Sequence, residues 1–360
     1  RTAYKQKDNA KLKELVKEAY QFLLEDVEAS HILFAVNSPE EADAALQKAK
    51  KARKGLKKSN FAKVATELSD DPSVQFNQGY LGWFTGGQMV YPFEKATYQL
   101  KKGKISQPIR SDFGYHLILL HDRRPSKGEI RVAHILKRKP YQADSAQLAA
   151  VKEEVFKMHQ QLKEGANFAE FARLYSDDKE TLQGGELPWL SLGKTPPEFE
   201  KAAFDLNAEN RLSEPVEAVY GWHIIHLLEK RPIGSFESYQ EKLTNRVKMD
   251  QRRSIINRSF IDKLKKEYNF KIGKNDTIAT FANQIISKED FGEFIESVGD
   301  TTVTQEAYID VRLMQYENQQ LENKYPEFGM LMNEYREGIL LFNICNDLIW
   351  SRASKDTEGL

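Results

Sequence analysis

Four of the seven histidines in this sequence lie at paired positions of an internal repeat, and one aspartate accompanies each pair. An imidazole beside a carboxylate can share a hydrogen bond with it and can gain or lose a proton near neutral pH. These residue types therefore suit proton transfer or the stabilisation of a polarised group. The repeated residues are His31, Asp71 and His116 in the first copy and His134, Asp178 and His223 in the second copy.

The repeat extends well beyond these residues. The aspartate and the second histidine recur after 107 residues and the first histidine after 103, so the length difference lies in the first connection of each copy. A period near 100 residues is far longer than the repeats of solenoids and propellers, and it indicates a duplicated globular domain. The matching segments are 30–33 with 133–136, 60–62 with 167–169, 69–71 with 176–178, 79–81 with 185–187 and 113–118 with 220–225.

Each copy has the pattern strand, helix, helix, strand, helix, strand, strand. This order favours an α+β fold in which a small, mainly antiparallel sheet is surrounded by helices. Asn60 and Asn167 are expected to cap the second helix of their copies. The expected strands are 30–36, 80–84, 105–109, 115–120, 132–136, 186–190, 212–216 and 222–228, and the expected helices are 40–56, 60–68, 92–100, 145–162, 167–175 and 197–206.

Both copies resemble the parvulin family of peptidyl-prolyl cis/trans isomerases. The resemblance covers roughly 200 of the 360 residues, with the motifs in the order typical of the family. The wider layout, with a helix before and helices after two tandem modules, resembles the SurA-type periplasmic chaperones of Gram-negative bacteria. The first-copy motifs are the strand with His31, Ser69-Asp70-Asp71, the strand Gly79 to Phe84, the segment Gln88 to Glu94, and Phe113-Gly114-Tyr115-His116.

The resemblance implies a particular chemistry. Rotation about an X-Pro bond is slow because amide resonance imposes a barrier of about 18–20 kcal/mol. A catalyst needs an apolar pocket for the proline ring and polar groups that favour the twisted amide, without a covalent bond to the protein. The six repeated polar residues are then the catalytic group. The proline-binding residues are Leu81, Met89, Phe93 and Phe113 in the first module and Leu187, Thr195, Phe199 and Tyr220 in the second module.

The second module departs from the pattern at Thr195. A polar, β-branched side chain replaces Met89 there, and Pro196-Pro197 follows it directly. We therefore expect the second module to hold a proline ring less well than the first.

Structural roles are the alternative for these residues. A histidine next to an apolar strand can be a hydrogen-bonded core residue, and a pair bridging two strands can stabilise an inactive copy. Asp71 and Asp178 could instead stabilise turns, and Met89 and Phe93 could be core residues. The only thiol, Cys345, lies outside both modules, so a Cys–His mechanism is not expected.

Other kinds of site find less support, and no cofactor or metal is expected. His116 and His121, like His223 and His226, are separated by odd numbers of residues, which places the two rings on opposite faces of a strand. The Gly86-Gly87 and Gly184-Gly185 pairs lack the residues that accompany phosphate binding and indicate turns instead.

The overall composition indicates folded, soluble domains. The chain is 40% hydrophobic and 29% charged, and its 53 basic and 53 acidic residues balance. This balance argues against nucleic acid as a partner, and the lysine-rich stretch 48–58 is expected to be a solvated helix face. No apolar stretch approaches the roughly 20 residues of a membrane-spanning helix. Because the chain begins without Met, we expect it to be a piece of a longer protein.

The segments outside the two modules are mainly helical. We expect residues 1–28 to hold one amphipathic helix, from about Asp8 to Asp26, as the remnant of a helical chaperone region. The modules occupy residues 29–124 and 125–235. Residues 236–360 are expected to contain a long helix from Phe236 to Tyr268, two short strands within 278–286, a helix capped by Ser287 and Asp290, and a last helix from Glu327 to about Arg352.

Together these patterns predict a periplasmic foldase, either free or associated with the outer membrane, that isomerises X-Pro bonds and chaperones unfolded outer-membrane proteins without ATP. Partners other than unfolded chains could include the outer-membrane assembly or secretion machinery, whereas no nucleotide is expected. Two alternatives stay open: a non-catalytic, peptide-binding chaperone, or a structural subunit of an assembly or secretion complex. The intact first pocket favours an enzyme, whereas Thr195 and the large helical remainder favour binding.

Overall fold

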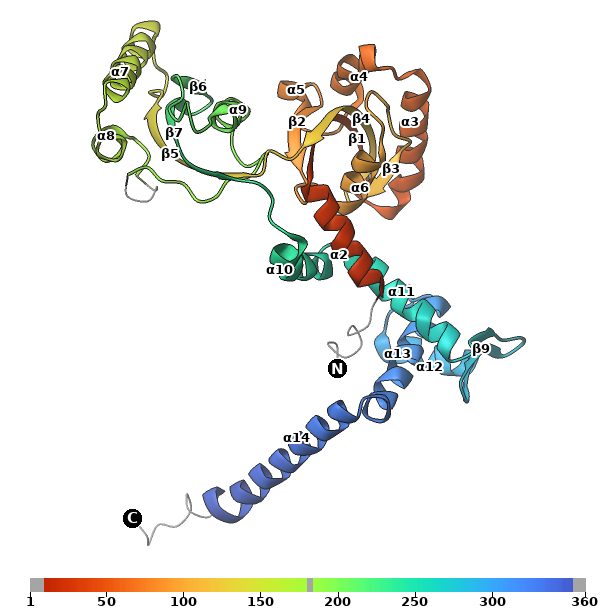
Figure 1. The fold of residues 1–360 in the computed structure, drawn as a ribbon. Coiled ribbons are helices and arrows are strands. Elements are labelled where there is room, and N and C mark those ends of the chain that lie inside the picture. Colours follow the sequence, from red (N-terminus) through yellow and green to blue (C-terminus); the bar gives the residue numbers. More distant parts are fainter. Residues whose placement is uncertain (1–9, 180–183, 352–360) are drawn as a thin grey trace. The chain divides into compact units, whose positions relative to one another are not determined.

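The computed structural model describes residues 10–179 and 184–351, and Figure 1 shows their elements. The chain divides into two compact units. One comprises residues 15–251 and contains both repeats, and the other combines the residues up to 14 with those from 252 onwards. The first described helix is α2 (Ala10–Leu23), so the expected start at Asp8 lies outside the described residues. In the described ranges, no helix has both the length and the apolar character needed to span a bilayer.

The first module is built on a four-stranded antiparallel sheet of order β2-β1-β4-β3. Successive side chains of a strand point to opposite faces, so β1 directs Ile32 and Phe34 to one face and His31 to the other. The elements of this module are β1 (Glu25–Ala35), η1 (Pro39–Glu41), α3 (Ala42–Gly55), η2 (Lys58–Asn60), α4 (Phe61–Leu68), α5 (Val74–Asn77), β2 (Tyr80–Thr85), α6 (Tyr91–Gln99), β3 (Ile109–Ser111) and β4 (Gly114–Pro125).

Two apolar clusters cover the two faces of this sheet. On one face, Ile32 and Phe34 pack with Ala45 and Ala49 of α3 and with Phe61 at the start of α4. On the other face, a separate cluster joins the sheet to α6, with Val27, Ala29, Phe84, Phe93, Ile118 and Leu120 as its buried members. The first cluster anchors the helices, and the second borders the histidines.

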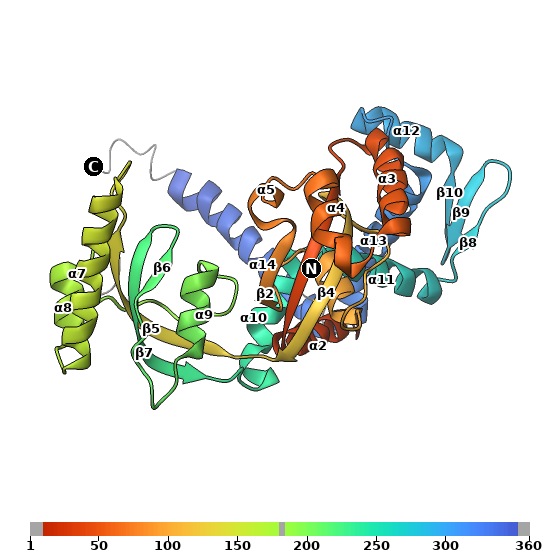
Figure 2. The ribbon, with the colours of Figure 1, turned by 90° about the horizontal axis from the view of Figure 1, so that it is seen from above.

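The second module repeats this plan around a three-stranded sheet of order β5-β7-β6. Helices α7 and α8 cover one face of the sheet and α9 the other, as Figure 2 shows. The expected α+β architecture with two tandem modules is therefore confirmed. The elements of this module are β5 (Glu129–Arg138), α7 (Ser145–Lys163), α8 (Phe168–Tyr175), α9 (Pro197–Asp205), β6 (Val216–Ala218) and β7 (Gly221–Arg231).

Three of the expected strands are wrong in extent. The expected strand at 186–190 is held only by isolated bridges at Glu186 and Leu190, with Pro188 between them. The expected strands at 105–109 and 212–216 are likewise mostly isolated bridges, and the regular strands start only after Pro108 and Pro215. Because proline has no N–H to donate, it interrupts a ladder of hydrogen bonds.

The two asparagines behave differently from each other. Asn167 caps α8, because its side chain accepts a hydrogen bond from the Glu170 N–H at 3.1 Å. The Asn60 side chain instead accepts from the Lys57 N–H at 2.7 Å and donates to the Gly55 carbonyl at 3.1 Å, so it stabilises the turn before α4. Asn60 therefore occupies the N-cap position of α4 as expected, but its side chain makes no capping hydrogen bond to that helix.

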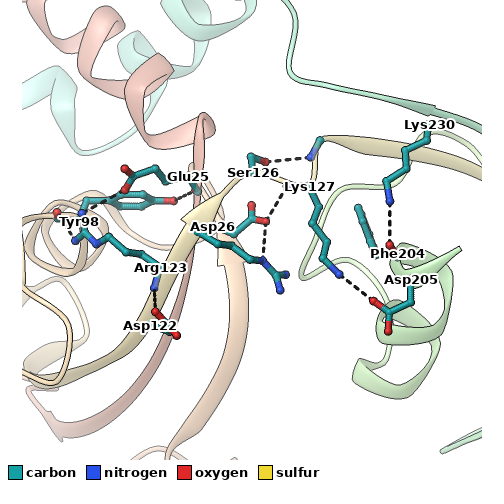
Figure 3. Close-up of polar contacts among 12 residues, drawn as sticks. Glu25, Asp26, Tyr98, Asp122, Arg123, Ser126, Lys127, Phe204, Asp205 and Lys230 are labelled. Atoms are coloured by element: carbon teal, nitrogen blue, oxygen red, sulfur yellow. Dashed lines mark hydrogen bonds and ion pairs between the residues drawn. The ribbon is translucent and has the colours of Figure 1, made fainter. Parts of the chain in front are cut away.

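The connection between β4 and β5 is fixed by polar contacts at both ends, shown in Figure 3. Asp26, fully buried at the start of β1, accepts from the Lys127 N–H at 3.0 Å and lies 3.4 Å from the Arg124 guanidinium. The Lys127 ammonium lies 3.0 Å from Asp205, the last residue of α9. Desolvation raises the pKa of Asp26, and its hydrogen bonds and Arg124 oppose this shift. The linker is thus tied to side chains of both modules.

The expected long helix from Phe236 to Tyr268 is wrong, because the chain forms α10 (Phe236–Met249) and α11 (Arg252–Glu267) instead. Asp250 is extended, with φ of −93° and ψ of −171°, and the break coincides with the boundary between the two compact units. Val247 before the break and Arg252 after it are both buried. No Pro or Gly marks this position, so the break reflects the burial of side chains on both sides of it.

The remaining elements form a smaller core of their own. The two expected strands and the Ser287–Asp290 capping box at the start of the following helix are present. The last helix ends at Cys345 and continues as a π-helical turn, whereas Arg352 lies outside the described residues. These elements are β8 (Lys271–Ile272), β9 (Thr277–Phe281), β10 (Gln284–Ser287), α12 (Lys288–Val298), α13 (Gln305–Lys324), α14 (Pro326–Cys345) and the π turn Asn346–Trp350.

Candidate functional site

The first candidate site lies on neighbouring antiparallel strands of the first module. His31 of β1 faces Ile118 of β4, and His116 of β4 faces Leu33 of β1. The two histidines are therefore diagonal neighbours on one face of the sheet. Their rings stack with centroids 5.8 Å apart and an angle of 18° between planes.

Asp71 follows α4 and approaches the same histidine pair from a loop. Its Oδ2 lies 2.6 Å from Nε2 of His31, and its Oδ1 accepts from the Ser73 N–H at 2.9 Å. The aspartate therefore stabilises its own turn and also orients the imidazole. Its side chain thus combines the structural role and the role in the site, which the sequence analysis treated as alternatives.

Ser111 at the end of β3 completes the polar group, and the sequence analysis missed it. Its Oγ lies 2.7 Å from Nε2 of His116 and also accepts from the Phe113 N–H at 3.2 Å. The Nδ1 atoms of His31 and His116 are both buried without a hydrogen-bond partner in the described structure. Each ring is thus held through its Nε2 atom, and its Nδ1 atom has no hydrogen-bond partner.

The apolar residues expected around a proline ring gather beside these histidines. Phe93 of α6 is buried and lies edge-on to both rings, 5.7 Å from His31 and 5.3 Å from His116 between centroids. Leu81 and Met89 are partly buried against the same cluster. Phe113 is 60% exposed, which fits a position on the rim. Six of the seven residues expected in the first site thus gather on this side of the module, and Phe113 is linked to them through its N–H, which donates to Oγ of Ser111.

Burial keeps both histidines neutral. Desolvation lowers the pKa of His31, against the opposing effect of the Asp71 carboxylate. Desolvation and the neighbouring His31 lower the pKa of His116 to about 4. Burial alone would raise the pKa of Asp71, but the hydrogen bonds from Ser73 and His31 lower it. At neutral pH the group therefore consists of a carboxylate and two uncharged imidazoles.

A glycine at the same place in each module lets the backbone approach the first histidine. The His31 N–H donates to the Gly79 carbonyl at 2.8 Å, and the His134 N–H donates to the Gly185 carbonyl at the same distance. Both glycines have a positive φ near 80°, and a Cβ on either would lie within 2.5 Å of the histidine carbonyl oxygen. Only glycine fits there without displacing the strand.

The second module brings together its own polar residues in a related arrangement. Nε2 of His134 lies 3.1 Å from Oδ2 of Asp178, and the rings of His134 and His223 stack 5.5 Å apart. Here, however, the two Nδ1 atoms lie 3.3 Å apart, which requires one ring to donate and the other to accept. Desolvation and His134 lower the pKa of His223 to about 4.

A missing hydroxyl accounts for part of this difference. The position of Ser111 is occupied by Ala218 in the second module, and Nε2 of His223 is buried without a hydrogen-bond partner among the described residues. His223 can therefore form a hydrogen bond with His134 but not with a side chain on β6. The two modules share their histidines and differ in how they hold them.

The apolar side of the second site is less complete. Phe199 is buried and edge-on to both rings, 5.8 Å from His134 and 5.2 Å from His223, and Leu187 packs against the same cluster. Thr195 is half-buried and does not belong to this cluster, whereas Tyr220 is 62% exposed. The structure therefore retains the aromatic wall and lacks the methionine beside it.

A buried glutamate in each module also escaped the sequence analysis. Glu94 accepts from the Gly87 N–H and Glu200 accepts from the Gly193 N–H, so each carboxylate fixes the loop that leads to Met89 or Thr195. Desolvation raises the pKa of Glu200 to about 7, against the backbone hydrogen bonds that favour its charged form. The signal was present in the sequence, because Phe-Glu-Lys-Ala occurs at 93–96 and again at 199–202.

In chemical terms, each module places neutral imidazoles and one carboxylate beside an apolar, aromatic-lined surface. Such a group can exchange hydrogen bonds with a substrate amide, and the buried surroundings strengthen these interactions. The free thiol Cys345 lies in α14, outside the modules. The arrangement therefore suits non-covalent stabilisation of an altered amide.

A model of the rotamase family, described as the PPIC-type PPIase domain, matches residues 31–122 and 134–229. These two ranges together make up more than half of the chain. The chain belongs to this family of peptidyl-prolyl isomerase domains, and it carries the domain twice. Each matched range contains the histidines and the aspartate of one site.

Several known proteins are similar to parts of the chain. Chaperone SurA of Methylobacillus flagellatus is 35% identical over 216 residues, which cover 58% of this chain and 48% of the relative. Chaperone SurA of Nitrosococcus oceani is 33% identical over 235 residues, which cover 63% of this chain and 54% of the relative. The chain thus spans about half the length of these curated relatives.

Solved structures of the same kind are also similar. The peptidylprolyl isomerase PrsA from Bacillus cereus is 26% identical, and the match covers 49% of this chain and 58% of the PrsA chain, with a TM-score of 0.27. The parvulin NmPin of Nitrosopumilus maritimus is 40% identical and matches 27% of this chain and 96% of its own, with a TM-score of 0.21.

Proposed function

We propose that this chain catalyses cis/trans isomerisation of X-Pro bonds in unfolded polypeptides and that it also acts as an ATP-independent chaperone. The observation that carries the proposal is the His31–Asp71–His116 group beside Phe93, which combines neutral hydrogen-bonding groups with a surface for a proline ring. Family membership and the similarity to SurA chaperones support it.

The residues act in two roles in this proposal. Leu81, Met89 and Phe93 hold the pyrrolidine ring, with Phe113 on the rim, while the histidines and the aspartate favour the twisted amide over the planar one. No bond to the substrate forms, because the rotation requires only the loss of amide resonance. The second module uses His134, Asp178 and His223 with Leu187, Thr195, Phe199 and Tyr220.

We further propose that the first module is the more active one. Its support is the Ser111–His116 contact and the packing of Met89, which Ala218 and Thr195 do not reproduce. The functional boundaries would be residues 29–124 and 125–235 for the modules, with residues 1–28 and 236–360 as the flanking parts of a chaperone region, except that β1 extends the first module back to Glu25.

By analogy with the SurA chaperones, the clients would be unfolded outer-membrane proteins in the periplasm of a Gram-negative bacterium. Such chains expose alternating apolar residues before they reach lipid. The apolar side chains exposed on α14, including Leu340, Leu341 and Phe342, offer a surface that such segments could cover. Contacts with assembly or secretion machinery belong to the same proposal.

The test uses the whole chain and a matched pair of substitutions. Asp71→Asn and Asp178→Asn each replace a carboxylate by an amide of equal size, one in each module. Exchange NMR on a proline-containing peptide then measures isomerisation. The proposal expects a large loss for Asp71→Asn and a smaller loss for Asp178→Asn. Full activity in the combined variant would refute the assignment of these groups, and no activity in the unsubstituted chain would refute the enzyme.

A further inference from the structure

The first module has a strongly basic stretch that the second copy of the same fold lacks. Residues 42–63 contain eight lysines and arginines and one acidic residue, whereas the matching stretch 145–170 contains three lysines and four glutamates. Both stretches form two helices that cover the same face of their sheet. Because the fold forms without this charge in the second copy, the folding of the module does not explain the lysines.

The lysines lie on the outer side of α3 and of the turn after it. Ala45 and Ala49 are buried against the sheet, and Ala42 and Ala52 pack beside them, so the small residues of the helix face inward. We call the outward group the lysine face. It consists of Lys48, Lys50, Lys51, Lys54, Lys57 and Lys58, all of which are exposed.

These charges are not neutralised by the module itself. Within the described residues, none of the six lysines forms a close ion pair with an acidic side chain, and Lys58 has only a longer-range interaction with Asp122. The one arginine of α3 behaves differently, since Arg53 donates to the backbone carbonyls of Ile105 and Ser106 at 3.1 and 2.8 Å. Arg53 thus has a structural role, and the lysine face has none.

A neighbouring loop extends the positive surface. Lys102 lies 2.6 Å from Asp122, and Lys102 together with Lys58 lowers the pKa of that aspartate. The loop with Lys102 therefore lies beside the turn with Lys58. Lys101 and Lys104 in the same loop are also exposed, which adds two further charges to this side of the module.

The lysine face and the candidate active site lie on opposite sides of the sheet. Helix α3 covers the face that carries Ile32 and Phe34, whereas His31 and Phe93 belong to the other face. A partner that covers the lysine face would leave the proline-binding side open to substrate.

We propose that the lysine face docks the protein on a bilayer surface rich in anionic phospholipid headgroups. Lysines are flexible point charges without the fixed fork of arginine, and they suit a diffuse negative surface better than individual, oriented phosphates. Residues 42–58 include no aromatic side chain on which a base could stack, which disfavours single-stranded nucleic acid. The balanced net charge of the chain conceals this local asymmetry. The inference goes beyond isomerase and chaperone activity and does not depend on either.

The test is flotation of the full chain with vesicles of phosphatidylcholine alone or with added phosphatidylglycerol. We expect binding only to the anionic vesicles, with loss at high salt. The variant Lys50→Glu/Lys54→Glu/Lys57→Glu/Lys58→Glu should bind on the order of 1,000-fold less, since it removes four lysines that each contribute on the order of 1 kcal/mol near such a surface. The matched control, Lys201→Glu/Lys242→Glu/Lys271→Glu/Lys274→Glu, changes the net charge equally at exposed lysines outside the face and should keep binding.

Three outcomes would overturn the proposal. Equal losses in the two variants would show that only net charge matters. Abolition of binding by inorganic phosphate, at an ionic strength where chloride leaves it intact, would indicate a site for single phosphates. Binding of soluble polyglutamate through the lysine face, without binding to anionic vesicles, would assign the face to an acidic polypeptide. Circular dichroism and unchanged isomerase activity check that the charge-reversed variant is folded.

Discussion

Nε2 of His116 lies 2.7 Å from Oγ of Ser111, and the matching residue in the second module is Ala218. This serine holds His116 through Nε2, and Asp71 holds His31 through Nε2, so the two rings of the first module keep separate hydrogen-bond partners. In the second module, His223 has its hydrogen bond with His134 instead. The same two histidines are therefore arranged as two separately held rings in one copy and as a directly bonded pair in the other.

Ser111→Ala should lower kcat/KM of the first module about fivefold, because a net hydrogen bond to a buried group contributes about 1 kcal/mol. Ser111 acts by positioning His116, so the NMR signals of the His116 ring should also shift. Ser106→Ala is the matched control, since its buried hydroxyl accepts from the Ile118 N–H at 2.9 Å without contacting a histidine. Equal loss of activity in both variants would reduce Ser111 to a structural residue.

Exchanging the methionine and the threonine between the modules should transfer part of the difference in activity. Met89→Thr should weaken proline binding in the first module, and Thr195→Met should improve it in the second. Because Met89 is only partly buried, we expect about 1 kcal/mol, or roughly a fivefold change in KM. The measurement is peptide isomerisation by the full chain with the other module inactivated by its aspartate-to-asparagine substitution. Unchanged KM in both directions would mean that Thr195 is not the limiting feature.

Stability of the first module should fall as the pH drops from about 6.5 toward 4. The folded-state pKa of His116 is lowered to about 4, so in this range the unfolded chain binds a proton that the folded module does not. The stabilisation is present above the unfolded pKa, and its loss is on the order of 3 kcal/mol for this histidine. Hydrogen exchange of first-module amides at several pH values measures it. His116→Gln should flatten the profile, and an equally steep profile in that variant would assign the effect to other groups.

The second module should show an opposing effect from Glu200. Its folded-state pKa is raised to about 7, so the folded module keeps a proton that the unfolded chain loses between about 4.5 and 7. This contribution is present at low pH and is lost as the pH rises through 7. His223, whose pKa is lowered to about 4, acts in the opposite direction over part of this range, so Glu200→Gln should make the stability of the second module rise more steeply with pH, as measured by hydrogen exchange of second-module amides. If the variant and the natural sequence have the same pH profile, the carboxyl is already ionised at neutral pH.

The duplication made much of the fold predictable, because each element had to satisfy the same pattern twice. The histidines and the aspartates of each site followed from it, whereas Phe93 and Phe199 followed from the family resemblance. Local pattern was insufficient where tertiary contacts decide, as at the break after Met249, where no helix-breaking residue occurs. Ser111 was missed for a related reason, since its partner His116 becomes its neighbour only when β3 pairs with β4. Pro108 and Pro215, by contrast, are visible in the sequence, and they predict shorter strands than those expected at 105–109 and 212–216.

Chaperone activity should be separable from isomerisation, because the exposed apolar side chains of α14 belong to a different element from the proline site. Leu340, Leu341 and Phe342 are 57–63% exposed, so replacing them with serine should weaken binding of unfolded chains without emptying a core. Met89→Ala with Phe113→Ala removes two of the three pocket side chains that are not fully buried, and it spares Phe93, whose loss would cost several kcal/mol of stability.

Light scattering by a diluted, urea-unfolded β-barrel protein measures suppression of aggregation, and peptide exchange NMR measures isomerisation. The Met89/Phe113 variant should lose isomerisation and keep suppression, whereas the Leu340/Leu341/Phe342 variant should do the reverse. Replacing the exposed residues Glu334 and Glu337 of the same helix with glutamine controls for general changes to α14. Loss of both activities together in the Met89/Phe113 variant would instead place client binding at the isomerase site.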